Sequence, residues 1–273
     1  MMEELARAKL NLALHVRGRQ ADGYHSIETL FAFCADGDRL RVEEGEGLSL
    51  RLAGPFGLSL AAEPDNLVLR AARALADRFD VDPRASLTLD KRLPVASGIG
   101  GGSADAAAAL RLLNRWWDIG AEERDLLDLA RPLGADVPAC LLSRTCRGGG
   151  RGDDLREVAV PELAGMPVLL VNPGVPVATG PVFRAWSGVD GGALPEDFRQ
   201  GRNDLQAPAA SVAPVIAEVL GLLAAAPGAT LVRMSGSGAT CFALFDVSEY
   251  RDAAAQAIAA VQPEWWRMAT RLR

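Results

Sequence analysis

The chain has 273 residues, of which 49% are hydrophobic and 23% are charged, so intrinsic disorder and a fibrous architecture are poor fits. Its apolar stretches, such as Met166 to Val171, are far shorter than the roughly 20 residues of a membrane-spanning helix, and its N-terminus lacks the pattern of a secretory signal. The formal net charge of -6, without any run of five like charges, argues against a nucleic-acid-binding surface. We expect a soluble globular protein with one large domain or two small ones.

The cysteines are scattered along the chain, at Cys34, Cys140, Cys146 and Cys241, and do not form two pairs at metal-ligand spacing. Because the chain also has only two histidines, a zinc site is not expected. Free thiols are typical of the reducing cytosol, so we expect a cytoplasmic protein.

The N-terminal third is predicted to be rich in strands. Residues 8–16 alternate strictly, which places Leu10, Leu12, Leu14 and Val16 on one face and Lys9, Asn11, Ala13 and His15 on the other. The pair Asp22-Gly23 signals a turn, after which Tyr24 and His25 open a second strand over residues 24–31. Farther on, Pro64-Asp65-Asn66 precedes apolar residues at helical spacing over 67–79.

A glycine-rich loop lies between a predicted strand over residues 86–93 and a predicted helix that starts near Ala104. Ser103 is the expected N-cap of that helix. Because glycines leave backbone N–H groups unshielded and a helix start carries partial positive charge, the loop can hold an anion, although glycine clusters also occur in plain tight turns. The loop fits neither the Walker pattern nor the Rossmann fingerprint, because no Gly-Lys-Ser/Thr follows it and Ser103 stands where the Rossmann pattern has its third glycine.

The second half of the chain alternates strands and helices. A helix over residues 122–133 ends at Gly134, and the glycine- and arginine-rich residues 147–152 interrupt all periodicity, so they are the candidate domain boundary. A strand over 168–172, helices within 203–226, a hairpin over 230–245, a helix over 249–261 and a strand over 266–270 then follow. This β-α-α-β-β-α-β order favours a small α+β sandwich.

Separated segments of the chain resemble the motifs of the GHMP small-molecule kinases. They are Ala8 to Leu12 with Asp22 to His25, Leu93 to Ala107, and Met234 to Ala239, and the segments Gly134 to Pro138 and Asn203 to Leu205 also match in type and order. The resemblance therefore spans nearly the whole chain. It implies an α+β, two-lobed fold, with a ribosomal-protein-S5-domain-2-like lobe over residues 1–155 that carries the ATP-binding loop and a ferredoxin-like lobe over residues 156–273.

The resemblance also implies a kinase that uses ATP and Mg²⁺. The run from Arg19 to His25 points to a cytidyl substrate, so the expected reaction is phosphorylation of the 2-hydroxyl of 4-diphosphocytidyl-2-C-methyl-D-erythritol in the methylerythritol phosphate route to isoprenoid precursors. Two alternatives stay open: a kinase for another acceptor, such as homoserine or mevalonate, and a catalytically silent nucleotide-binding relative. We expect a monomer or homodimer with no nucleic-acid or membrane partner.

The site residues follow from the same resemblance. Asp136 would accept the proton of the substrate hydroxyl, and Lys9 would keep Asp136 ionised. ATP would contact Asn66, Lys91, Pro94, Gly98, Gly100, Gly101, Gly102 and Ser103. Besides Asp136, the acceptor substrate would contact Asn11, Tyr24, His25, Thr179 and Phe183, with Tyr24 and Phe183 stacking on cytosine. No direct protein ligand for a metal is predicted.

Each of these residues also has a structural interpretation. Taken alone, Lys9 could be a solvated charge, Asp136 the N-cap of a helix and Phe183 part of the core, while Asp105 would simply favour the dipole of its helix. The chain also departs from the family pattern. Ala104 stands where a second serine is common, and residues 148–154 are unusual where a Gly-x-Gly-Glu segment is expected, so substrate contacts there are in doubt.

Overall fold

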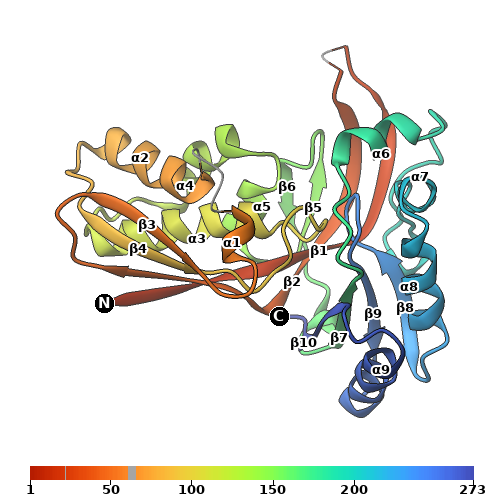
Figure 1. Ribbon diagram of the computed structural model, residues 1–273. Coiled ribbons are helices and arrows are strands. Elements are labelled where there is room, and N and C mark those ends of the chain that lie inside the picture. Colours follow the sequence, from red (N-terminus) through yellow and green to blue (C-terminus); the bar gives the residue numbers. More distant parts are fainter. Residues whose placement is uncertain (22, 61–65) are drawn as a thin grey trace. The chain divides into compact units, whose positions relative to one another are not determined.

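The computed structural model describes residues 1–21, 23–60 and 66–273 (Figure 1). Asp22 of the predicted turn, and Pro64 and Asp65 before the predicted helix, lie outside the described residues. The chain forms two compact units that interleave along the sequence: unit 1 comprises Met1–Lys9, Asp36–Val95 and Gly100–Ser143, and unit 2 comprises Leu10–Ala35, Ala96–Ile99 and Arg144–Arg273. The linear division at residue 155 stays a prediction.

The described strands are β1 (Met2–Arg19), β2 (His25–Glu43), β3 (Leu48–Ala53), β4 (Ala85–Asp90), β5 (Cys146–Gly149), β6 (Asp154–Glu157), β7 (Pro167–Asn172), β8 (Ala229–Met234), β9 (Cys241–Phe245) and β10 (Trp266–Arg271). The described helices are α1 (Gly57–Leu60), α2 (Leu67–Phe79), α3 (Gly101–Trp116), α4 (Glu123–Ala130), α5 (Val137–Leu142), α6 (Thr179–Ala185), α7 (Gln206–Val212), α8 (Val215–Ala224) and α9 (Ser248–Val261), with short 3-10 helices η1 (Arg131–Leu133), η2 (Pro161–Leu163) and η3 (Phe198–Gln200).

Unit 1 is built on a sheet in which β4 pairs antiparallel with the second half of β2 and parallel with β3. Ala85, Leu87 and Leu89 of β4 are fully buried, as the alternation of a half-buried strand requires. Helices α2, α3, α4 and α5 gather beside this sheet (Figure 1). The alanines at positions 104 and 106–109 of α3 are buried and small, so α2 and α5 can pack closely against this helix.

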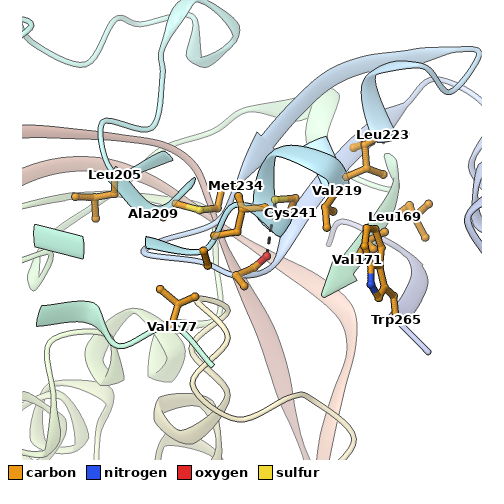
Figure 2. Close-up of a cluster of buried hydrophobic side chains, with 14 of the residues drawn as sticks. Leu169, Val171, Val177, Leu205, Ala209, Val219, Leu223, Met234, Cys241 and Trp265 are labelled. Carbon is orange, nitrogen blue, oxygen red and sulfur yellow. Dashed lines mark hydrogen bonds between the residues drawn. The ribbon is translucent and has the colours of Figure 1, made fainter. Parts of the chain in front are cut away.

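Unit 2 contains an antiparallel sheet in the order β10-β7-β9-β8. Helices α8 and α9 pack on it, because their apolar residues face the buried side chains of the strands. Figure 2 shows this core, in which Leu169 and Val171 of β7 lie near Val219 of α8 and Trp265. Each fully buried aliphatic side chain of this size contributes about 1.5 to 3 kcal/mol to folding.

Two segments of this fold differ from what the sequence pattern predicted. Residues 147–149 are not irregular, because they belong to β5, which pairs antiparallel with β2 and β6, whereas residues 150–152 lie in the turn between β5 and β6. The glycines make this pairing possible: a Cβ on Gly148 would lie 2.7 Å from Cε2 of Phe31, so only a residue without a side chain lets β5 pass over that ring. Helix α6 was not predicted, since its seven residues TGPVFRA carry a glycine and a proline and only Val182 is buried.

Candidate active site

Lys9 and Asp136 meet in unit 1. The Nζ atom of Lys9 lies 3.1 Å from Oδ2 of Asp136, and the side chain of Lys9 is 3% exposed whereas that of Asp136 is 37% exposed. Asp136 occupies the N-cap position of α5, but its side chain does not cap the helix, so the carboxylate is available to the ammonium. At an effective dielectric of about 20 this pair gains about 5 kcal/mol of Coulomb energy before desolvation is subtracted.

The glycine-rich loop ends beside this ion pair. Gly100 has φ +65°, and a Cβ there would lie 3.0 Å from Cε of Lys9. Gly100 is also the N-cap of α3, so the prediction that Ser103 caps this helix is wrong: Ser103 lies inside the first turn. The left-handed backbone at Gly100, which glycine adopts without cost, starts the helix three residues earlier than a serine cap would. The first amides of α3, which have no intrahelical acceptor, therefore belong to Gly101, Gly102 and Ser103.

Lys91 lies in a buried cluster in the same unit. Its side chain is 2% exposed and donates hydrogen bonds to Oδ2 of Asp38 and, at 2.7 Å, to Oδ2 of Asp105. Asp105 is therefore more than a partner of the helix dipole. The expected contact of Lys91 with adenosine stays a prediction.

The other two residues expected near adenosine are also buried. Asn66 caps α2, with its Oδ1 accepting from the backbone N of Val68 at 2.9 Å, and Pro94 is buried at the start of the loop. Their contacts with ATP stay predictions too.

In unit 2, Asn11 belongs to a chain of buried hydrogen bonds. Its Nδ2 donates to Oγ1 of Thr29 at 2.8 Å, and its backbone N donates to Oγ of Ser235 at 3.1 Å. Ser235 in turn donates to the carbonyl of Gly98 at 3.0 Å. A Cβ on Gly98, whose φ is +79°, would lie 2.4 Å from the carbonyl oxygen of Ser235, so the start of the glycine loop and the segment Ser235 to Gly238 touch backbone to backbone. Asn11, Gly98 and Ser235 thus bring the three predicted motifs together within this unit.

Asn203 fixes the shape of the segment Ser235 to Gly238. Its Nδ2 donates to the carbonyls of Met234 and Gly236, both at 2.8 Å, and its Oδ1 accepts from the backbone N of Leu205. Thr179, at the start of α6, lies beside the same segment, because its Oγ1 is 3.1 Å from Oγ of Ser237.

The predicted nucleobase residues lie in unit 2, where each contacts another ring or a guanidinium. The rings of His25 and Phe183 stack with centroids 4.7 Å apart, and Trp186 meets His25 edge-on at 5.7 Å. Burial, followed by the charge of Arg19, lowers the pKa of His25, so this ring is neutral near pH 7. Tyr24 is 55% exposed and has the guanidinium of Arg151 over its ring at 4.5 Å. Stacking of Tyr24 and Phe183 on cytosine stays a prediction.

Several residues at these positions were not singled out from the sequence as site residues. They are Asp38, Thr29, Arg151 and Trp186. Asp38 gave no local signal, because its partners Lys91 and Asp105 lie 53 and 67 positions away along the chain. A buried aspartate beside a strand end is recognisable only once the topology is known.

Comparison with known proteins places the chain in a family. Residues 66–144 match the GHMP kinases N terminal domain, and residues 193–267 match the GHMP kinases C terminal domain. The chain belongs to the GHMP kinase family. The predicted α+β, two-lobed fold of these kinases is confirmed.

The relatives of this GHMP kinase extend over its full length. A protein of Rhizorhabdus wittichii named 4-diphosphocytidyl-2-C-methyl-D-erythritol kinase is 58% identical, over 99% of this chain and 94% of that protein. A protein of the same name from Sphingopyxis alaskensis is 51% identical, over 100% of this chain and 99% of that protein. These relatives confirm the resemblance that the motifs predicted.

Solved structures agree with this placement. A crystal structure of 4-(cytidine 5'-diphospho)-2C-methyl-D-erythritol kinase superposes with a TM-score of 0.85 at 35% identity and covers 99% of both chains. Homoserine kinase from Cytophaga hutchinsonii superposes with a TM-score of 0.69 at 18% identity, covering 97% of this chain and 96% of that chain, which shows a shared fold alone. Within the part of the chain that the structure describes, no helix combines the length and apolarity needed to cross a membrane.

Proposed function

We propose that this GHMP kinase transfers the γ-phosphoryl group of ATP to the 2-hydroxyl of 4-diphosphocytidyl-2-C-methyl-D-erythritol, a step of the methylerythritol phosphate route to isoprenoid precursors. The observation that carries the proposal is the 46% to 58% identity, over nearly the full chain, to relatives that bear the name of that kinase. The geometry of unit 1 supports it, because phosphoryl transfer needs a proton acceptor and positive charge beside a phosphate cradle.

Lys9 and Asp136 are assigned the transfer chemistry. The carboxylate of Asp136 accepts the proton of the substrate hydroxyl, the hydroxyl oxygen forms a bond to the γ-phosphorus, and the bond from that phosphorus to the β-γ bridging oxygen breaks to release ADP. The ammonium of Lys9 lies 3.1 Å from Oδ2 and holds in place the carboxylate that accepts this proton. Proton transfer to a positioned base contributes typically about 10² to 10⁴ in rate.

The start of α3 is assigned to the phosphates of ATP. Gly102 is exposed, and among the described residues a Cβ there would have only Leu67 in ordinary van der Waals contact, so a phosphate oxygen can approach the backbone closely. The described residues include no group of three His, Cys, Asp or Glu side chains that could hold a metal ion. Magnesium, which keeps several of its waters, is therefore proposed to arrive with the nucleotide, where it neutralises phosphate charge.

Residues of unit 2 are assigned to the acceptor. Asn11 and Thr179 would contact the erythritol portion, and His25 would recognise the edge of cytosine. Tyr24 and Phe183 would supply aromatic surface for the base, a type of contact worth on the order of 1 to 3 kcal/mol per base in nucleic-acid complexes.

A coupled assay of ADP release tests the proposal. Purified protein is supplied with MgATP and one of four acceptors: 4-diphosphocytidyl-2-C-methyl-D-erythritol, methylerythritol phosphate without the cytidyl group, homoserine or mevalonate. We expect turnover only with the first, and a loss of about 10² or more in kcat for Asp136→Asn. Asp128→Asn is the control, because this side chain is 72% exposed and pairs with Arg131 on the surface of unit 1.

The outcomes separate the alternatives. Turnover with homoserine or mevalonate alone would support kinase activity but contradict the proposed cytidyl substrate. Folded protein without any turnover would favour a catalytically silent nucleotide-binding relative.

A further inference from the structure

A cluster of three buried charges joins separate parts of unit 1. Lys91, directly after β4, donates hydrogen bonds to Asp38 of β2 and to Asp105 of α3, and these three residues are 1%, 0% and 2% exposed. Burying charged groups is costly unless they are paired, so the cluster holds together only as a set.

The cluster lies directly beneath the start of α3. A Cβ on Gly101 would come within 2.9 Å of Nζ of Lys91, so nothing separates the ammonium from the backbone of the first helical residue. The other oxygen of Asp38 accepts from the backbone N of Leu93 at 2.8 Å, which ties the strand end before the loop to the same cluster. The net charge of the cluster therefore attracts or repels an anion that binds at the start of α3.

The charge of this cluster depends on Asp105. Among the described residues its Oδ1 is buried and has no hydrogen-bond partner, which is costly for a carboxylate but less so for a carboxylic acid. Burial, with a contribution from Asp38, raises the pKa of Asp105 to about 7 although Lys91 opposes the shift. Cys140 of α5 is also close to Asp105. Burial raises the pKa of this thiol, as does the charge of Asp136, whereas the charges of Lys9 and Arg111 lower it. Cys140 stays neutral near pH 7, so the ionisation of Asp105 sets the charge.

We propose that Asp105 is a positioning residue for nucleotide binding, which holds the Lys91 ammonium beneath Gly101 and takes up a proton from solvent when nucleotide phosphates bind at the start of α3. With Asp105 ionised the cluster carries one positive and two negative charges and repels an anion. With Asp105 protonated the cluster is neutral, and the repulsion is gone. This inference rests on the proposed role of the α3 start in nucleotide binding, but not on the identity of the acceptor.

The test measures binding of MgADP by titration calorimetry from pH 6 to pH 8.5, without acceptor. For the wild type we expect Kd to rise on the order of tenfold across this range, as two unit charges about 10 Å apart at an effective dielectric near 20 require. Asp105→Asn, which keeps the shape and cannot ionise, should bind MgADP with a Kd that changes less than twofold. The ionisation of ADP itself is common to both proteins. Asp128→Asn, an exposed carboxylate in the same unit, should follow the wild type.

The result that overturns the proposal is a variant Asp105→Asn with the same rise in Kd as the wild type. If this variant does not fold, the wild type alone decides: the binding enthalpy at pH 7.5 in phosphate and in Tris gives the number of protons exchanged. Net uptake supports the proposal, and no uptake or net release contradicts it. Because no acceptor is present, failure to phosphorylate the cytidyl substrate leaves this result standing, and failure of the proton coupling leaves the kinase activity standing.

Discussion

Replacing Gly100 by alanine probes the link between the glycine loop and the ion pair. The backbone of Gly100 has φ +65°, a left-handed conformation that costs an L-residue about 1 to 2 kcal/mol. The added Cβ would also lie 3.0 Å from Cε and 3.3 Å from Cβ of Lys9, whereas ordinary van der Waals contact begins at 3.4 Å. Lys9 is almost fully buried, so it cannot swing into solvent and must shift within the site.

The size of the effect follows from this shift. To restore ordinary contact Lys9 must move by about 0.4 Å, and a comparable lengthening of its 3.1 Å distance to Asp136 weakens the Coulomb attraction by roughly 0.6 kcal/mol at an effective dielectric near 20. Misplacement of a reacting group by about 1 Å can cost on the order of 10² in rate, so a shift of this size is expected to lower kcat about tenfold.

Gly120→Ala is the matched control. Gly120 has φ +69°, nearly the same as Gly100, but no atom of the described residues beyond its chain neighbours lies within 4 Å of its added Cβ. Thermal denaturation should show a loss of about 1 to 2 kcal/mol from backbone strain in both variants, and the ADP-release assay should show the tenfold loss of kcat in Gly100→Ala alone. A Gly100→Ala protein with the kcat of the wild type would refute the reasoning.

Four further changes test the assignments. Lys9→Met should lower kcat by about 10² or more in the ADP-release assay, because the ammonium beside Asp136 is lost. The circular dichroism spectrum should stay unchanged, because the partly exposed Asp136 can be hydrated. Phe183→Ala should raise KM for the cytidyl acceptor on the order of tenfold and leave KM for ATP unchanged. Because the pKa of Asp105 is raised, the folded protein keeps a proton that the unfolded chain has already released. The free energy of unfolding therefore falls as pH rises from 3.8 to about 7, and Asp105 causes no further change above pH 7. Urea denaturation should show that Asp105→Asn lacks this loss, which is at most about 1.4 kcal/mol per pH unit. Gly102→Ala should leave stability unchanged or raise it by up to about 1 kcal/mol, yet raise KM for ATP several-fold.

Local signals were strong enough to predict much of the fold. The helix over 67–79 was predicted with both ends correct, since its apolar residues repeat at helical spacing and Asn66 is a typical cap. The strand that carries Lys9 was predicted from its alternation, although β1 is longer at both ends. The N-cap of α3 was predicted wrongly for a local reason, because the left-handed turn at Gly100 overrides the capping preference of Ser103. The other features that the sequence did not reveal depend on contacts between distant residues.

Some contacts of the candidate site were expected from the sequence, and others were not. The pairing of Lys9 with Asp136 was expected from the resemblance of the motifs. No sequence pattern indicated that Lys91 would be buried and paired with Asp38 and Asp105. A lysine after a strand is usually exposed, and only the fold brings two carboxylates to its ammonium. The sequence therefore indicated which residues are candidates for the site, and the fold showed which of them are buried among other charged groups, as Lys91 is.

The glycines of the loop illustrate this division. A Cβ on Gly98 would collide with backbone, one on Gly100 would force Lys9 to shift, and one on Gly101 would lie 2.9 Å from Nζ of Lys91, so the fold itself disfavours a side chain at each of these positions. Gly102 differs, because its nearest neighbour at the Cβ position is Leu67 at 3.7 Å and its backbone is helical. Glycine is a poor helix former, so packing and propensity both favour alanine at residue 102. The missing side chain fits the proposed approach of a phosphate to the backbone, so Gly102→Ala tests that proposal separately from the demands of folding.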